Sequence, residues 1–153
     1  MADILIIGYG NELRSDDGAG PAVARYVESL RLPGVRTLVL PQLTPELAAD
    51  IACARAVIFV DAQPAHEAHE VQVLLLSPSS PRALGSHTSD PGALLALTQA
   101  LYGRCPPTWL VAVPAARFDL GTELSPLTQA AVGQALERIR ALCASVPTER
   151  TEA

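Results

Sequence analysis

The sequence predicts an α/β sandwich built on a mixed sheet, and three observations carry this prediction. Short apolar runs alternate along the chain with segments of helical spacing. A small or polar residue followed by proline precedes each helical segment. One connection between two apolar runs is too short for a parallel crossover. The 153 residues fit one domain, which we expect to span 1–145, followed by a frayed polar tail at 146–153.

Five apolar runs are the predicted strands. They are ILIIG (4–8), TLVLP (37–41), AVIFVD (56–61), VQVLLL (71–76) and WLVAVP (109–114). The first, third and fifth are apolar throughout, which is typical of strands covered on both faces. Only residues 62–70 separate the third run from the fourth, whereas a parallel crossover needs about a dozen residues or more. We therefore expect 71–76 to run antiparallel to its neighbours, at an edge of the sheet.

Four dipeptides mark the predicted helix starts. They are Gly20-Pro21, Thr44-Pro45, Asp90-Pro91 and Ser125-Pro126. Proline suits the first helical turn, where its missing N–H would have no partner in any case, and Ser, Thr or Asp before it can cap the helix. The predicted order of elements is β-α-β-α-β-β-α-β-α. Residues 77–90 form the one long loop, and long loops inside compact domains are usually functional.

Composition excludes several classes of function. The net charge of −5 and the pI of about 5.1 argue against binding to nucleic acid or to an anionic membrane. All 11 basic residues are Arg, which excludes Schiff-base lysines and a P-loop lysine. No apolar run approaches the roughly 20 residues of a membrane span. Three widely spaced cysteines without C-x-x-C indicate a reducing compartment, so we expect a cytoplasmic protein.

The loop GYGNELRSDDGAG (8–20) raises a choice between a nucleotide site and a carboxylate site. A dinucleotide fingerprint needs G-x-G-x-x-G, and Leu13 stands where the third glycine should be. No acidic residue follows the second strand to hold a ribose. Asp16 and Asp17 would also repel a phosphate. These features disfavour a nucleotide-dependent enzyme, which equilibrium binding of NAD or ATP would test.

Three candidate ligands map to the carboxyl ends of the strands, where open α/β sheets bind their ligands. Asp17 follows the first strand, Asp61 closes the third, and His87 lies in the long loop. Two carboxylates and one imidazole form an incomplete ligand set for a divalent metal such as zinc or nickel, with positions left open for a substrate. Taken singly, each residue also has a structural interpretation: a helix cap for Asp17, a paired buried acid for Asp61 and a surface residue for His87.

Four motifs resemble the nickel-iron hydrogenase maturation proteases over nearly the whole chain. They are GYGNELRSDDGAGP, VIFVDA, SHTSDPGALL and FDLGTELSP, and the first is the most specific. The resemblance implies a phosphorylase/hydrolase-like, three-layer α/β/α sandwich with a five-stranded mixed sheet. It implies a cytoplasmic endopeptidase that removes a C-terminal peptide from a hydrogenase large-subunit precursor.

The resemblance also assigns roles to residues. Asp17, Asp61 and His87 would be both the catalytic residues and the metal ligands. Separately from the resemblance, we expect Gly10, Asn11 and Asp16 to help to position the substrate. The family picture is that no metal is permanently bound, and that the nickel is carried by the partner, a nickel-loaded precursor. The alternative is a non-catalytic module that senses the metal or escorts the precursor.

Overall fold

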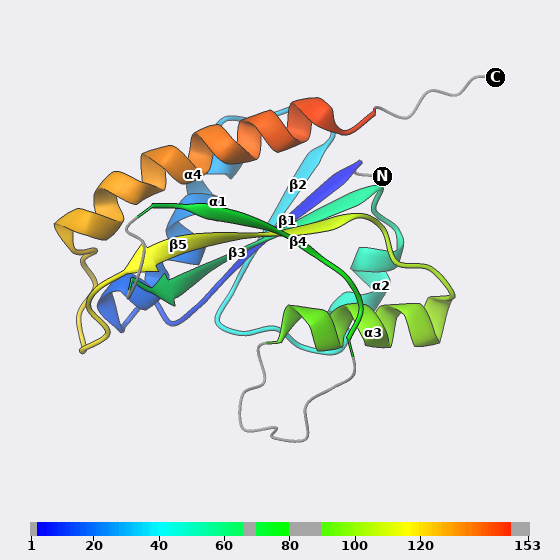
Figure 1. Cartoon of the computed structure of the whole chain (residues 1–153), viewed down its shortest axis with the longest axis horizontal. Helices are drawn as coiled ribbons and strands as arrows, with labels where there is room; N and C mark the ends of the chain where they lie inside the picture. Colours follow the sequence, from blue (N-terminus) through cyan, green and yellow to red (C-terminus); the bar gives the residue numbers. More distant parts are fainter. Residues whose placement is uncertain (1–2, 66–69, 80–89, 148–153) are drawn as a thin grey trace.

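The computed structural model describes residues 3–65, 70–79 and 90–147, and Figure 1 shows the whole chain. In chain order the elements are β1 (Ile4–Tyr9), the 3-10 helix η1 (Ser15–Gly18), α1 (Ala19–Ser29), β2 (Val35–Leu40), α2 (Leu47–Ala52), β3 (Ala56–Pro64), β4 (Gln72–Leu76), α3 (Pro91–Tyr102), β5 (Thr108–Ala115) and α4 (Pro126–Ser145). Apart from the short η1, this is the predicted order.

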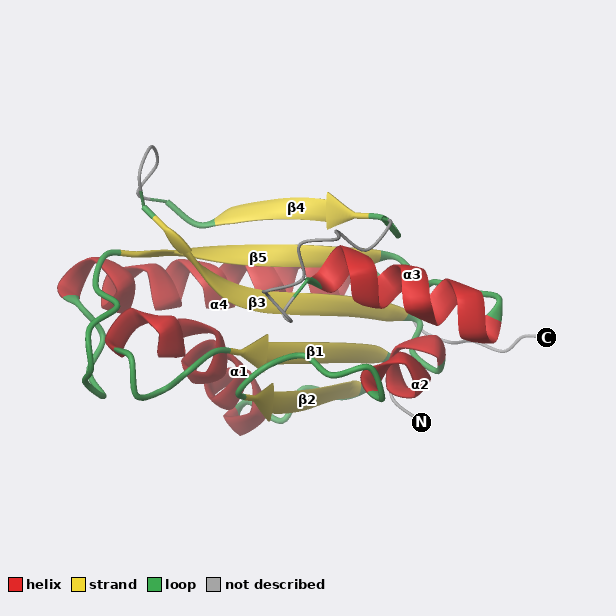
Figure 2. Ribbon diagram, turned by 90° about the horizontal axis from the view of Figure 1, so that it is seen from below, coloured by secondary structure: helices red, strands yellow, loops and turns green. Residues whose placement is uncertain are grey.

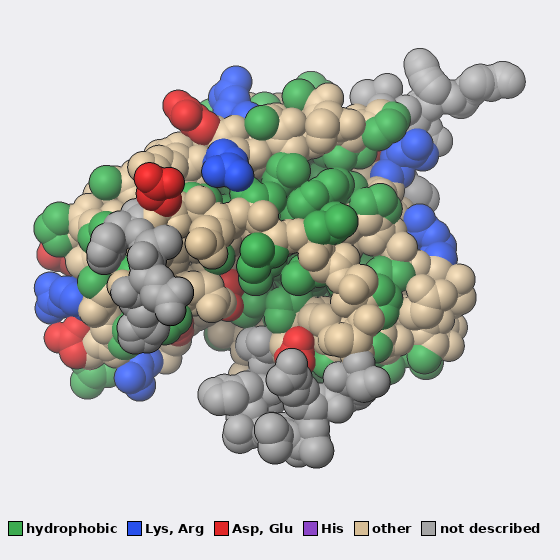
Figure 3. All heavy atoms as spheres, viewed as in Figure 1, with side chains coloured by type: hydrophobic (Ala, Val, Ile, Leu, Met, Phe, Trp, Pro, Cys, Tyr) green, Lys and Arg blue, Asp and Glu red, His purple; other side chains and the backbone are tan. Residues whose placement is uncertain are grey.

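The five strands form one mixed sheet in the order β2-β1-β3-β5-β4. All neighbours pair in parallel except β4, which pairs antiparallel with β5 at the edge. Figure 2 shows β4 pointing against β1 and β2. The prediction made from the short connection before residue 71 is therefore confirmed. Leu74 and Leu75 of β4 are 46% and 73% exposed. Figure 3 shows hydrophobic side chains gathered on one face of the molecule.

Two helical layers cover the sheet, so the three-layer α/β/α sandwich is confirmed. Helices α1 and α4 pack on one face and α2 and α3 on the other (Figure 2). Side chains alternate between the faces of a strand. In β1 and β3 the even-numbered apolar residues pack under α1 and α4, and the odd-numbered ones pack under α2 and α3. This alternation decides which helices face the side chains at the strand ends.

Some element boundaries differ from the prediction. Strand β3 continues beyond Asp61 to Pro64, because its pairing with β5 extends to Pro64 and Ala115. Helix α1 begins at Ala19, directly after η1, and α2 begins only at Leu47.

The predicted caps of α3 and α4 are present. Asp90 accepts hydrogen bonds from the N–H groups of Gly92 and Ala93, and Ser125 accepts one from Thr128 N–H. Helix α4 ends at Ser145, and Val146 packs against the core. Residues 148–153 lie outside the described residues, so the frayed tail stays a prediction. No helix in the described ranges has the length and apolar character to cross a membrane.

Candidate functional site

Two side chains meet at the carboxyl ends of β1 and β3. The parallel register pairs Gly8 with Val60, so Tyr9 and Asp61 are the next residues of neighbouring strands. Both are odd-numbered, and Tyr9 packs with the core under α2 and α3. Asp61 therefore lies beside Tyr9 on the same face of the sheet. Helix α3 begins on this face, and Asp90 is its N-cap.

Glycines bring the first loop and α1 close to the strand ends that carry Tyr9 and Asp61. A Cβ on Gly8 would lie 2.2 Å from the carbonyl oxygen of Gly20, and a Cβ on Gly20 would lie 2.4 Å from that of Val60. Real Cβ atoms do not approach backbone this closely, so the start of α1 lies against β1 and β3 only because both positions lack a side chain. Asp17, one turn earlier in η1, is held near the strand ends as a result.

Asp17 is oriented by the backbone of its own loop. Its Oδ2 accepts a hydrogen bond of 2.7 Å from Asn11 N–H. Asn11 Oδ1 accepts one of 2.9 Å from Leu13 N–H, which fixes the turn before η1. The Gly10 N–H donates to Leu40 O at 3.1 Å. The N–H groups of Gly10 and Asn11 are therefore engaged within the chain, so both residues shape the loop. A substrate contact by the Asn11 side chain stays a prediction.

Burial and neighbouring charge shift the pKa values at the site. Burial raises the pKa of Asp61 to about 6, the neighbouring Tyr9 hydroxyl opposes this rise, and the charge of Asp17 adds to it. Burial, followed by the nearby carboxylates of Asp61, Asp90 and Asp17, raises the pKa of Tyr9 far above its ordinary value. The charges of Asp61, Asp90 and Asp17 are therefore near enough to Tyr9 to act on its hydroxyl.

Asp16 has a different role from its neighbour Asp17. It is 0% exposed. Its Oδ2 accepts hydrogen bonds from Ala116 N–H, Arg117 N–H and Ser125 Oγ, and its Oδ1 accepts one from Ser125 N–H, all at 2.7–2.8 Å. Burial alone would raise the pKa of Asp16, but these hydrogen bonds outweigh it and lower the pKa to about 2. A fully buried carboxylate with these bonds anchors the loop, and a part for Asp16 in positioning the substrate stays a prediction.

We expect Gly10→Ala to disturb this site severely. Gly10 has φ of 149°, and a Cβ there would lie 2.0 Å from the backbone oxygen of Asp17. The clash and the strained φ should destabilise the fold by roughly 2 kcal/mol or more and displace Asp17. Chemical denaturation measures the effect. The matched control is Gly133→Ala in α4, where a Cβ meets nothing within 4 Å and should stabilise by about 0.5–1 kcal/mol. Equal stabilities of the two variants would contradict this account of the loop.

The structure thus brings two of the three predicted ligands, Asp17 and Asp61, to one sheet end. His87 lies outside the described residues, and its part in the site stays a prediction. Within residues 3–65, 70–79 and 90–147, no group of three or more His, Cys, Asp or Glu could hold a metal ion. Sequence reasoning missed Tyr9, and it assigned Asp90 only to capping. Tyr9 and Asp61 are both odd-numbered residues of neighbouring strands, and this alternation is the signal that places them on one face of the sheet.

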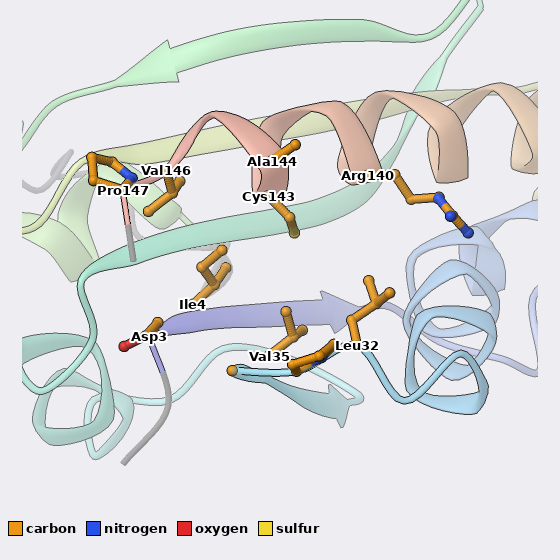
Figure 4. Close-up of a pocket in the computed structure, with 11 residues that line it drawn as sticks. Asp3, Ile4, Leu32, Val35, Arg140, Cys143, Ala144, Val146 and Pro147 are labelled. Carbon is orange, nitrogen blue, oxygen red and sulfur yellow. The ribbon is translucent and has the colours of Figure 1, made fainter. Parts of the chain in front are cut away.

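A pocket of about 260 Å³ lies at the opposite end of the strands. Figure 4 shows Ile4 and Val35, at the starts of β1 and β2, facing Cys143 and Val146 at the end of α4. Ligands of open α/β sheets bind at the carboxyl ends of the strands. The strand ends that carry Tyr9 and Asp61 are therefore a better candidate for the active site than this pocket.

Comparison with known proteins finds similar solved structures. No protein-family model and no curated protein matches the chain. The NiFe hydrogenase maturation protease HybD from Thermococcus kodakarensis is 27% identical, with a TM-score of 0.72 over 93% of this chain and 99% of that one. The chain is therefore similar in structure to a hydrogenase maturation protease.

Two further solved structures of hydrogenase maturation proteases have the same fold. The hydrogenase maturating endopeptidase HybD from E. coli is 24% identical over 95% of this chain and 94% of that chain, with a TM-score of 0.74. The maturation protease HycI from T. kodakarensis is 24% identical over 95% and 92%, with a TM-score of 0.66. All three of these solved structures are described as hydrogenase maturation proteases or endopeptidases.

Proposed function

We propose that this chain is a peptidase that removes the C-terminal extension of a nickel-iron hydrogenase large-subunit precursor after nickel insertion, and that it recognises the nickel carried by the substrate. The observation that carries the proposal is the placement of Asp17 and Asp61, whose charges act on each other, at the carboxyl end of the sheet, in the fold of the maturation proteases. We further infer that the reaction takes place in the cytoplasm. The three cysteines, which form no disulfide, fit a reducing compartment.

The electrostatics of the site favour a divalent cation. Asp61 is partly desolvated, and the charge of Asp17 adds to the cost of ionising it. Both costs fall when a cation arrives between the carboxylates. Asp17, Asp61 and the imidazole of His87 would supply three ligands, which leaves positions for the groups that hold the nickel in the precursor. This ligand set suits transient recognition better than a permanent metal site.

The chain's own contribution to catalysis is to bind and orient. Asn11 N–H holds Asp17, and Gln63 Nε2 donates to Asp61 Oδ2 at 3.1 Å, so both carboxylates have a defined direction before the substrate arrives. A precursor gripped through its nickel presents its scissile bond at a fixed place. Positioning of this kind can supply several kcal/mol of the activation barrier. A divalent nickel would itself supply Lewis-acid polarisation of a carbonyl or of water.

The test uses nickel-loaded and nickel-free precursor with the purified chain. We expect mass spectrometry to detect a released C-terminal peptide only from the nickel-loaded form. Metal-dependent binding without any cleavage would instead identify a non-catalytic escort or metal sensor. Cleavage of both forms at equal rates would contradict recognition of nickel.

We also expect the purified chain to be metal-free, because its predicted ligands are too few for a closed structural site. Elemental analysis measures this. Stoichiometric, tightly bound zinc would overturn the proposal and indicate an autonomous metallopeptidase.

A further inference from the structure

Tyr9 carries a buried hydroxyl beside the carboxylate site. The residue is 2% exposed, and its Oη makes no hydrogen bond of standard geometry within the described part of the chain. A buried hydroxyl without a partner costs roughly 1–3 kcal/mol. Such groups are rare in native structures and often mark a functional role. Phenylalanine would fill the same space without this cost, so packing alone does not account for the hydroxyl.

The ring of Tyr9 is held firmly. It packs edge-on against Phe59, with ring centroids 6.2 Å apart and planes at 86°. Gly8 and Gly20, on either side of the β1 end, leave no room for the strand to shift toward α1. The hydroxyl therefore has little freedom to find another partner, and its direction is fixed by the core under α2 and α3.

Tyr9 lies beside Asp61 in the carboxylate site. Tyr9 and Asp61 are the next residues after the Gly8–Val60 pair and share one face of the sheet. No hydrogen bond of standard geometry joins the two groups in this structure. A tyrosine hydroxyl is protonated at neutral pH and can donate. The Tyr9 hydroxyl is thus available as a donor beside a carboxylate that can accept.

We propose that Tyr9 is a positioning residue, whose buried hydroxyl donates a hydrogen bond to the Asp61 carboxylate when that carboxylate turns to engage the substrate's metal. Together with the bond from Gln63, this fixes which oxygen faces the substrate. Outer-shell hydrogen bonds of this type orient carboxylate ligands, and their loss typically costs 10- to 100-fold in metal affinity or activity. The inference rests on the proposed function of the site.

The test compares Tyr9→Phe with Tyr26→Phe, which removes the hydroxyl of a 49% exposed tyrosine on α1. Three quantities are measured: kcat and KM for peptide release from nickel-loaded precursor, the rise in Tm that Ni²⁺ alone causes, and the free energy of unfolding. For Tyr9→Phe we expect kcat/KM to fall about 10- to 100-fold, mainly through kcat, and the Ni²⁺-induced rise in Tm to shrink. Its free energy of unfolding should equal or exceed that of the parent. Tyr26→Phe should change none of the three.

Each other outcome overturns a specific statement. If the parent cleaves and Tyr9→Phe matches Tyr26→Phe in kcat and in the Ni²⁺ effect, the role of Tyr9 is wrong while the proposed function stands. A clear loss of stability in Tyr9→Phe without a change in kcat would make the hydroxyl a structural group. If the parent does not cleave nickel-loaded precursor, the proposed function is wrong. The role of Tyr9 beside Asp61 is then tested by comparing the Ni²⁺-induced rise in Tm of the parent with that of Tyr9→Phe. If the parent shows neither cleavage nor a Ni²⁺-induced rise in Tm, both the proposed function and the role of Tyr9 are wrong.

Discussion

Asp61→Asn should abolish peptide release and, at pH 8, melt at a higher temperature than the parent. Loss of release is expected because the variant removes a carboxylate that we assign to the metal. The gain in stability is expected because the ionised Asp61 destabilises the fold. Burial and the charge of Asp17 raise its pKa to about 6, compared with its ordinary value of 3.8. Asparagine keeps an acceptor for Gln63 and carries no charge.

The sign of the pH dependence follows from the raised pKa. The folded state holds the Asp61 proton more tightly than the unfolded state does. The ionised Asp61 therefore lowers the stability of the fold. This loss is absent well below pH 3.8, grows between pH 3.8 and 6, and reaches its full size above pH 6. Allowing for partial exposure, we expect a gain of about 1 kcal/mol for Asp61→Asn at pH 8, or a few degrees in Tm. The gain should shrink as the pH falls from 6 toward 4.

The control for Asp61→Asn is Glu137→Gln, which neutralises an exposed carboxylate on α4. It should release peptide at the parent rate, and its Tm should follow that of the parent across the same pH range. Thermal melts at several pH values and mass spectrometry of the product provide both readings. Asp61→Asn with full activity would refute the assigned role. A lower Tm at pH 8 would show that the Asp61 charge stabilises the fold and that our electrostatic account is wrong.

Local chemistry made most of the fold predictable. The antiparallel β4 follows from the length of one connection, and the starts of α3 and α4 follow from capping side chains at Asp90 and Ser125. Strand β3 was predicted too short, because its last residues are held by pairing with β5 rather than by an apolar pattern. Similarly, α2 has no side-chain cap, so its beginning depends on tertiary packing.

The site was only partly predictable, because its two neighbouring acids look alike in sequence. Asp16 and Asp17 differ through contacts made about one hundred residues later in the chain, at Ala116, Arg117 and Ser125. No local pattern around SDDG reports those contacts. Tyr9 was missed for a related reason: the predicted strand ended at residue 8, so Tyr9 was assigned to the glycine-rich loop. Only the register of β1 against β3 places it beside Asp61.

Asp16→Asn should therefore unfold far more easily than the parent, whereas Asp17→Asn should keep its stability and lose activity. The Asp16 carboxylate accepts four hydrogen bonds in a fully buried place. An amide at Asp16 sets an NH₂ group against at least one of these donors, which should cost about 2–4 kcal/mol. For a chain of this length that loss lowers Tm by roughly 5–15 °C.

Asp17 is the matched comparison, because the change is the same and only the surroundings differ. It is half-buried, and an amide oxygen can still accept the bond from Asn11 N–H. We expect Asp17→Asn to melt within about 2 °C of the parent, as is usual for a substitution that leaves no buried group unpaired. Peptide release from nickel-loaded precursor should nevertheless fall below detection, because one of the predicted metal ligands is gone. Calorimetry and the cleavage assay separate the two variants. If both lose stability equally, Asp17 is a structural residue like Asp16; if Asp17→Asn retains full activity, the metal is held by other groups.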